Sequence, residues 1–231
     1  PAIQRKLEAH AMGLAEQLRV EHLELRNEQP QREDWLRKDR LYVGFKRQLA
    51  EDSDNNLRAI PRKQRAMVRK GIKAGLYAEL ESGVDHLFQT YSESVRNLGT
   101  PVLPKRHFEA IRQEFAEDVD VLTIRHQGRV VASVMSYYFR DQVMPYYGGG
   151  VSDARSLAAN DFMYWEVMQR AVERGCKVFD FGRSKVGSGS YHFKKHWGFE
   201  PHPLHYEYHL VKRSEMPELN PNNPRYALLI R

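Results

Sequence analysis

Apolar and polar residues follow each other along the chain in periods that predict most of its secondary structure. In the first 19 residues, five apolar side chains recur three or four positions apart, as on one face of an amphipathic helix. They are Ile3, Leu7, Ala11, Leu14 and Leu18. Short strands are predicted at His22–Arg26 and Leu41–Lys46, around a polar connection that contains proline. A helix and two strands cannot close a hydrophobic core of their own.

A polar segment separates this region from the next helices. Residues 50–60 are polar and are interpreted as a linker. Pro61 suits the first turn of a helix that runs to about Gly75, with Val68 and Ile72 on its apolar stripe. Two further helices are predicted at Val84–Asn97 and Pro104–Glu117.

Three runs of strand-forming residues come next. They are Val119–Arg125, Val130–Phe139 and Gln142–Gly150, each rich in Val, Ile, Tyr and Phe. Turn residues at Gln127-Gly128 and Arg140-Asp141 separate the runs, which predicts an antiparallel meander.

The last third of the chain alternates helix and strand. A helix is predicted at Asn160–Arg174, with Asn160 as its N-cap. Its broad apolar face consists of Phe162, Trp165, Met168 and Val172. A strand at Lys177–Phe181, a short helix ended by Gly198 and a strand at His205–Val211 complete the pattern. This order of elements predicts a mixed α+β fold.

Composition agrees with a globular protein: 41% of the 231 residues are hydrophobic and 11% aromatic. There is no apolar run near the roughly 20 residues that span a bilayer, and no signal-peptide pattern. We therefore expect a cytoplasmic protein. The one cysteine, Cys176, excludes an internal disulfide framework and a multi-cysteine zinc site. A buried, inert thiol is favoured over a nucleophile there.

The charge is basic, with a formal net value of +6 and a pI of about 9.3, which favours an anionic partner. Arg65, Arg69 and Lys73 fall on one stripe of the helix that begins at Pro61. No acidic residue occurs between Asp54 and Glu79 to balance them. The stripe is either a solvated face or a surface that binds nucleic acid or another anion.

The most distinctive stretch runs from Val178 to Leu204. A short strand turns at Gly182 and is followed by two cations and a flexible Gly-Ser-Gly-Ser segment. A short helix with aromatic and basic side chains then ends at Gly198. A strand, a glycine-rich bend and a helix start can bring backbone N–H groups and cations to an anion.

Two motifs in this stretch, FDFGRSK and YHFKKHWGFEP, resemble the C-terminal signature of FemAB-like proteins, a branch of the GNAT acyltransferase superfamily. The resemblance is strongest to the subgroup linked to exopolysaccharide and PEP-CTERM/exosortase loci. It continues upstream through Tyr147–Gly150, the helix at Asn160–Gly175 and the basic helix at Pro61.

The resemblance implies a GNAT-like fold, in which a mixed, largely antiparallel sheet is flanked by helices. Residues 1–49 would be the C-terminal remnant of a first GNAT-like domain, and residues 50–60 a linker. Residues 61–231 would be a second, FemAB-type domain, truncated at its C-terminus. The chain has no initiator Met, and a helix barely begins at Pro224, so we expect a piece of a longer protein that is cut at both ends.

The same resemblance assigns candidate catalytic residues. FemAB-like aminoacyltransferases have a Phe-Lys pair at the active site, which corresponds here to Phe193 and Lys194. Negative charge develops on the carbonyl and leaving oxygens during acyl transfer, and a fixed cation stabilises that transition state. The alternative interpretation makes Phe193 a core anchor and Lys194 a solvated side chain.

Substrate-binding residues are predicted on both sides of this pair. Arg183 and Lys185 follow a strand end, where they could bind a phosphate or carboxylate, or simply form a mobile charged loop. Tyr191 belongs to the same predicted set. Tyr147, Gly148 and Gly149 end a strand, and glycines without Cβ would let a substrate approach the backbone closely.

Conventional acetyl-CoA-dependent GNATs carry an Arg/Gln-x-x-Gly-x-Gly/Ala turn that holds the pyrophosphate. Here Gly150 is followed by Val-Ser-Asp-Ala-Arg-Ser-Leu, which does not reproduce that turn. Arg155 in this segment is either a second anion ligand or a plain loop arginine, and the second is favoured. The departure weakens the coenzyme A interpretation, which remains as an alternative.

Aspartate and histidine are two further residue types that could carry chemistry here. Asp180 in the strand is either a general base or one half of a structural ion pair, with Arg183 as a candidate partner. The ten histidines do not join carboxylates at metal-ligand spacing, so we expect no metal site.

Taken together, these residues predict an N-acyltransferase of FemAB type. It would pass an activated aminoacyl or acyl group to an amine of a peptidoglycan, other cell-envelope or exopolysaccharide precursor. No cofactor would be held permanently; the donor would be an aminoacyl-tRNA or, alternatively, acyl-CoA, as in a GNAT N-acetyltransferase. A different class remains open, a non-catalytic module that binds RNA or polysaccharide.

Overall fold

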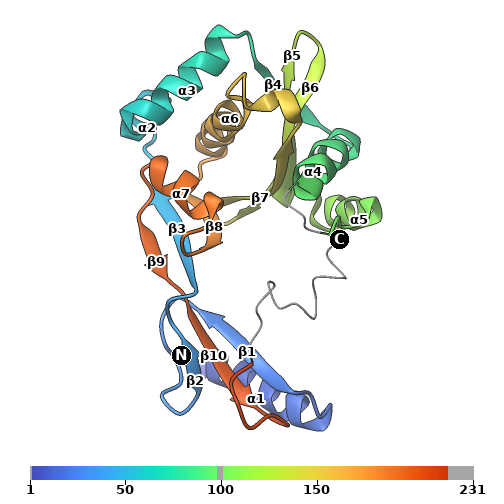
Figure 1. Cartoon of the computed structure of the whole chain (residues 1–231), viewed down its shortest axis with the longest axis vertical. Coiled ribbons are helices and arrows are strands. Elements are labelled where there is room, and N and C mark those ends of the chain that lie inside the picture. Colours follow the sequence, from blue (N-terminus) through green and yellow to red (C-terminus); the bar gives the residue numbers. More distant parts are fainter. Residues whose placement is uncertain (1, 98–100, 218–231) are drawn as a thin grey trace.

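The computed structural model describes residues 2–97 and 101–217. The predicted helix start at Pro224 lies outside these residues. In the described part, the elements form two sheets with helices packed on them (Figure 1).

The large sheet has seven strands in the order β4-β5-β6-β7-β8-β3-β9. These strands are β3 (Tyr42–Gln48), β4 (Tyr77–Glu81), β5 (Val119–His126), β6 (Arg129–Phe139), β7 (Gln142–Gly150), β8 (Val178–Lys185) and β9 (Pro201–Pro203). All neighbours are antiparallel except β7 and β8. The predicted mixed α+β class and the antiparallel β5-β6-β7 meander are therefore confirmed.

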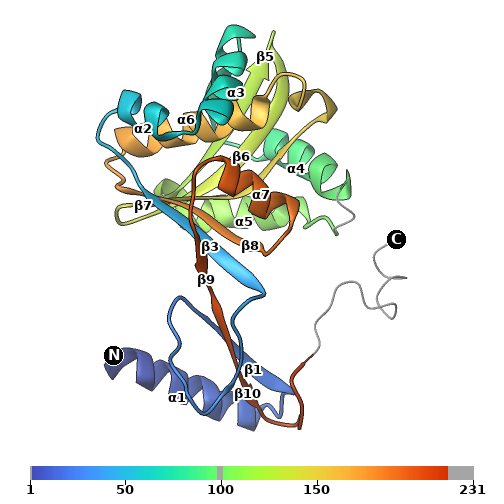
Figure 2. The same ribbon diagram turned by 60° about the vertical axis from the view of Figure 1, so that its left-hand side comes forward.

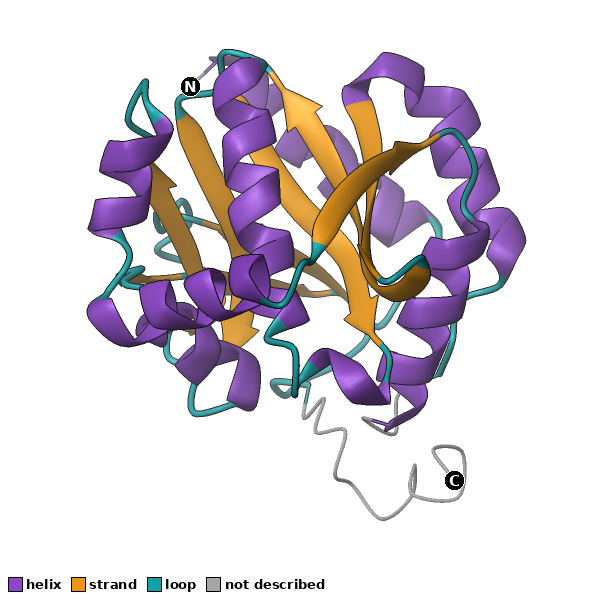
Figure 3. Cartoon of the chain, turned by 90° about the horizontal axis from the view of Figure 1, so that it is seen from above, coloured by secondary structure: helices purple, strands orange, loops and turns teal. Residues whose placement is uncertain are grey.

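Helices cover both faces of this sheet (Figure 3). They are α2 (Ser53–Ala59), α3 (Arg62–Lys73), α4 (Asp85–Asn97), α5 (Lys105–Phe115), α6 (Ala159–Glu173) and α7 (Gly189–His196), with short 3₁₀ turns at Ala116–Asp118 and Ser152–Ala154. On one face α6 buries Phe162, Trp165 and Met168, as its apolar periodicity predicts. On the other, Leu87 of α4 and Phe108 of α5 form a second core.

The small sheet has three strands in the order β1-β10-β2 and is accompanied by one helix (Figure 2). These elements are α1 (Ala2–Gln17), β1 (His22–Asn27), β2 (Leu36–Lys38) and β10 (His205–Leu210). The predicted N-terminal helix is present, but its apolar stripe is not packed. Ile3 is 77% exposed and Leu7 66%, whereas Ala15 and Glu8 are buried.

The chain crosses between the two sheets after β2 and again after β9. β3 follows the small sheet in sequence and pairs with β8 and β9 in the large one. β9 lies at the edge of the large sheet, and β10 directly after it is the central strand of the small sheet. Strand pairing thus crosses the boundary at residue 49, and the division into two GNAT-like domains stays a prediction.

Within residues 50–60, interpreted as a linker, Ser53–Ala59 form α2, capped by Asp52, whose side chain accepts from the Asn55 N–H. Two other local predictions differ from the structure. The N-cap of α6 is Ala158 in the left-handed region, so the prediction of Asn160 was wrong. β8 does not end at Phe181 but continues through Gly182 to Lys185.

A buried carboxylate holds the loop between β1 and β2 against the small sheet. Glu207 of β10 is fully buried. Its side chain accepts hydrogen bonds from the Asn27 Nδ2, at 2.7 Å, and from the Gln31 and Arg32 backbone N–H groups, at 3.0 and 2.8 Å. These bonds offset the cost of burying the charge and fix the loop that carries Glu28.

We predict that Glu207→Ala lowers the free energy of unfolding by about 2–4 kcal/mol, because buried donors lose their acceptor. Chemical denaturation measures this change. Glu200→Ala, at an exposed position, is the matched control and should stay within about 0.5 kcal/mol of the wild type. Equal stability of the two variants would contradict the anchoring role of Glu207.

Candidate functional site between β7 and β8

The parallel strands β7 and β8 pair over only two positions and then diverge. Gln142 lies opposite Val178 and Val143 opposite Phe179, and no further pair follows although both strands continue. Pro145 on β7 has no N–H to donate. Beside it the register between β6 and β7 shifts, so that Tyr146 is left without a partner on β6. The facing edges of two adjacent strands are therefore open to a ligand.

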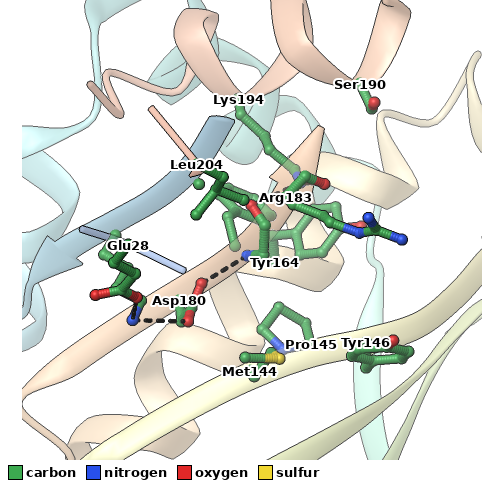
Figure 4. Close-up of a pocket in the computed structure, with 14 residues that line it drawn as sticks. Glu28, Met144, Pro145, Tyr146, Tyr164, Asp180, Arg183, Ser190, Lys194 and Leu204 are labelled. Carbon is green, nitrogen blue, oxygen red and sulfur yellow. Dashed lines mark hydrogen bonds and ion pairs between the residues drawn. The ribbon is translucent and has the colours of Figure 1, made fainter. Parts of the chain in front are cut away.

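A cavity of about 530 Å³ lies at this divergence (Figure 4). Its walls come from β3, β7, β8, α6 and α7 and from the loops after β1 and β9. The side chains that concern its chemistry are Glu28, Lys46, Tyr146, Tyr164, Asp180, Arg183 and Lys194. Ligand sites of this size are typical for small substrates or for the reacting ends of larger ones.

A bulge in β8 shapes one wall. Phe45 of β3 lies opposite Gly182 and Lys46 opposite Asp180, so Phe181 has no partner. Gly182 adopts φ of 69°, a conformation that favours glycine, and its N–H donates to the Asp180 Oδ1 at 2.8 Å. The predicted turn at Gly182 is thus a bulge within a continuous strand.

Lys194 on α7 is the lysine that the resemblance assigns to the active site. The residue is only 9% exposed and lines the cavity. Its Nζ donates to the carbonyl oxygens of Gly182 and Arg183 at 3.3 and 3.1 Å. An ammonium has three N–H donors, so one remains for a ligand. Burial lowers the pKa of Lys194 to about 8, although Asp180 opposes the shift. The interpretation of Lys194 as a solvated side chain was wrong.

Phe193 does not line the cavity. Its ring packs on Tyr164, Phe181 and Trp197, with centroids 5.6, 6.1 and 6.2 Å apart. This position fits the core-anchor interpretation, in which Phe193 holds α7 against the sheet. A catalytic role for Phe193 stays a prediction.

Asp161 fixes the far end of α7 and was not predicted. Its Oδ1 accepts from the Trp197 Nε1 at 2.9 Å and from the Gln64 Nε2 of α3 at 3.0 Å. Burial raises the pKa of Asp161, partly offset by these hydrogen bonds. Because Trp197 caps α7, the Asp161 contacts help to hold Lys194 in place. A lone Asp in a helix carries no sequence signal for this role.

Asp180 is paired, but not with Arg183. The ion pair joins its Oδ2 to the Lys46 Nζ at 3.5 Å, and Lys46 also contacts Glu28. Lys46 and Glu28 were not predicted to belong to the site. They come from β3 and from the loop after β1, and lie 134 and 152 residues before Asp180 in the sequence.

Of the two other cations predicted in this stretch, Arg183 lines the cavity and Lys185 does not. Arg183 lies at the cavity, over the Tyr42 ring at 4.9 Å, and donates to the Tyr206 hydroxyl. Lys185 is exposed and is not part of the cavity wall. Tyr191 is also outside the wall and packs edge-on against Phe45.

Tyr147, Gly148 and Gly149 do not line the cavity, and their role as substrate contacts stays a prediction. The Tyr147 hydroxyl lies 3.0 Å from the His107 Nε2, on the side of the sheet covered by α4 and α5. A Cβ on Gly149 would lie 2.6 Å from the Thr90 carbonyl oxygen. Gly149 thus admits the close approach of the chain's own α4, whereas a Cβ on Gly148 would meet Val134 of β6. The neighbouring Tyr146 lines the cavity instead.

The basic stripe lies on the outer side of α3. Arg69 and Lys73 are exposed and Arg65 is half-buried. Three more cations on α3 are exposed: Arg62, Lys63 and Lys70. In residues 2–97 and 101–217, the ion pairs involve other side chains, so this charge is unbalanced.

The described residues contain neither a metal-ligand cluster nor a membrane-spanning helix. No group of three or more His, Cys, Asp or Glu side chains is arranged to hold a metal ion. None of the helices is long and apolar enough to cross a membrane.

Comparison with known families matches residues 55–195 to the acetyltransferase (GNAT) domain. Among solved structures, FemX superposes with a TM-score of 0.72 at 14% identity, covering 99% of this chain and 79% of FemX. L-PGS from Bacillus licheniformis gives a TM-score of 0.55 at 14% identity, covering 78% of this chain and 63% of its own. This chain therefore spans less than two thirds of L-PGS. Curated proteins gave no match.

We predict that the free energy of unfolding depends on pH between 7 and 10 because the pKa of the buried Lys194 is lowered. Lys194 loses its proton near pH 8 when folded and near pH 10.5 when unfolded, so the unfolded state binds more protons between these values. Raising the pH from 7 to 10 should therefore stabilise the wild type relative to Lys194→Met by about 2–3 kcal/mol. Denaturant unfolding at both pH values measures it.

The exposed neighbour Lys195 supplies the control for this experiment. The stability difference between wild type and Lys195→Met should not change with pH over the same range. A Lys194→Met difference that is also constant from pH 7 to 10 would show that Lys194 is not buried as described.

Proposed function

The chain belongs to the acetyltransferase (GNAT) domain family, and from this premise we propose that it is an N-acyltransferase of FemAB type. It transfers an activated aminoacyl or acyl group to an amine. Fold alone does not define a reaction, so the proposal depends on the cavity between β7 and β8.

The observation that carries the proposal is the Lys194 ammonium, buried beside the cavity with one free donor. During transfer the acceptor amine attacks the acyl carbon and a C–N bond forms. The bond to the donor's oxygen or sulfur then breaks, and the leaving atom takes its electron pair while the amine nitrogen loses a proton. Lys194 stabilises the negative charge that develops on the carbonyl oxygen, and a low-dielectric site makes this contribution large.

Backbone groups supply the second element of the site. Beyond Val143 and Phe179 the facing edges of β7 and β8 do not pair with each other. An acyl donor that enters between the strands can hydrogen-bond to these edges, as an added strand would. The donor is thereby aligned with its reactive carbon in the cavity.

The basic stripe on α3, which forms no ion pair within the part of the chain that the structure describes, favours a charged tRNA as donor. The segment after Gly150, which departs from the usual pyrophosphate turn, points in the same direction. Acyl-CoA is the alternative donor, since it is the common cosubstrate of the GNAT family.

The acceptor class rests on the resemblance of the FDFGRSK and YHFKKHWGFEP motifs to FemAB-like proteins. It implies an amine on a peptidoglycan, other cell-envelope or exopolysaccharide precursor, and association with PEP-CTERM/exosortase loci. Transfer of a labelled group distinguishes the three hypotheses. Transfer from charged tRNA indicates the FemAB-type enzyme, transfer from acyl-CoA indicates the alternative enzyme, and transfer from neither donor indicates a non-catalytic binding module.

We predict that Lys194→Met lowers turnover about 10²–10³-fold, the effect of losing one oxyanion donor. Wild-type turnover should also fall as the pH rises through about 8, because the ammonium loses its charge. Lys194→Arg keeps the charge and should not show this alkaline decline. Wild-type turnover in Lys194→Met would rule out the role of Lys194.

We predict that Arg69→Gln/Lys73→Gln weakens tRNA binding and reduces the dependence of log affinity on log salt by about 1 for each cation removed. Binding titrations at several salt concentrations measure both quantities. The matched control is Lys6→Gln/Lys212→Gln, which removes two exposed cations elsewhere. An unchanged salt dependence in the Arg69/Lys73 variant would exclude α3 as the RNA surface.

A further inference from the structure

The end of α7 packs directly against the start of α3. Gly198, which follows α7 and has φ of 79°, lies against Pro61, the N-cap of α3. A Cβ on Gly198 would lie 2.9 Å from the Pro61 Cδ, so only glycine permits this approach. Lys194 is in the last turn of α7, three residues before the C-cap Trp197. The position of Lys194 is therefore linked to the packing of α3, the helix that carries the basic stripe.

A single carboxylate oxygen joins the two helices. The Asp161 Oδ1 of α6 accepts hydrogen bonds from both the Trp197 Nε1 and the Gln64 Nε2 of α3. The Trp197 side chain is fully buried and Gln64 is only 8% exposed. A buried donor that loses its acceptor costs free energy, so both helices favour the arrangement in which Asp161 lies between them.

This joint needs the oxygen of Asp161 rather than its charge. Both hydrogen bonds go to Oδ1, and within residues 2–97 and 101–217 Asp161 takes part in no ion pair. Asp161 is in the first turn of α6, where the helix dipole stabilises an anion. An asparagine presents the same acceptor oxygen, so it should keep the joint intact.

The other attachments of α7 are weaker. At its N-terminal end the Ser188 hydroxyl accepts the Tyr191 N–H at 3.3 Å, between the exposed glycines Gly187 and Gly189. The Lys194 Nζ donates to two backbone carbonyl oxygens of β8, and these bonds fix the ammonium only while α7 stays in place. The Trp197 end is therefore the firm attachment of the helix.

We propose that Asp161 is a positioning residue for Lys194, which it holds at the cavity by fixing Trp197 of α7 against α3. The inference rests on the proposed acyl transfer, in which the Lys194 ammonium stabilises the oxyanion. A shift of α7 by about 1 Å would move the ammonium away from the acyl oxygen and admit water to it. Either change weakens the stabilisation of the transition state. Asp161 does not line the cavity, so it acts only through Trp197.

The test measures the pKa of Lys194 by NMR titration of its Nζ signal, so it does not depend on turnover. Asp161→Leu removes the acceptor, whereas Asp161→Asn removes the charge and keeps the acceptor. The control is Glu207→Ala, which removes a buried carboxylate of the small sheet and separates a loss of stability from a loss of position.

In Asp161→Leu the pKa of Lys194 should rise from about 8 to about 9 or higher, because a loosened α7 lets water reach the ammonium. In Asp161→Asn it should stay near the wild-type value. Glu207→Ala should lower the melting temperature, as Asp161→Leu does, but leave the pKa of Lys194 unchanged. In acyl transfer, Asp161→Leu should lower kcat about tenfold and change KM for the donor less than about twofold.

An unchanged pKa of Lys194 in Asp161→Leu would overturn the proposal, and so would an equal rise in Asp161→Asn or in Glu207→Ala. If Asp161→Leu does not fold, Trp197→Phe takes its place, since it keeps an aromatic ring and lacks the N–H donor. The same rise is expected there, and its absence would overturn the proposal. A rise in Asp161→Leu together with no acyl transfer by the wild type would contradict the proposed reaction and leave the positioning role standing.

Discussion

The divergence of β7 and β8 is the constraint on which the rest of the site depends. Two parallel strands that stop pairing inside a sheet leave polar edges without partners, which is costly unless water or a ligand satisfies them. Because Pro145 and the two bulges are built into the strands, the divergence is a permanent feature of the sheet and not a fluctuation. The same bulge in β8 presents the Gly182 and Arg183 carbonyl oxygens that hold Lys194. One irregularity therefore creates both the cavity and the position of its cation.

Burying Lys194 costs stability, and the surrounding packing offsets that cost. The aromatic rings of Phe181, Phe193 and Trp197 hold α7 against the sheet, and Asp161 ties Trp197 to α3 and α6. Removing a cation from water disfavours its charged form and strengthens its attraction for a developing oxyanion. The burial of Lys194 thus destabilises the folded state but strengthens the stabilisation of the transition state.

Local patterns predicted the fold well and the site only in part. The meander and most helices follow from periodicity and turn residues, whereas Lys194 was singled out by the resemblance of its motif and Arg183 by its position after a strand end. Lys46, Glu28 and Asp161 were missed because strand pairing and helix packing bring them in from distant parts of the chain. The close approach of α4 to Gly149 was not predicted, because a glycine that permits close approach does not reveal which group approaches.

The most direct test of this account is the protonation of Lys194 itself. Selective labelling of lysine side chains and an NMR titration of the Nζ signal, assigned with Lys194→Arg, give its pKa. The account predicts a value of about 8, set by burial beside the cavity. A value near 10.5, that of a lysine in water, would show that Lys194 is solvated and would contradict its role in acyl transfer.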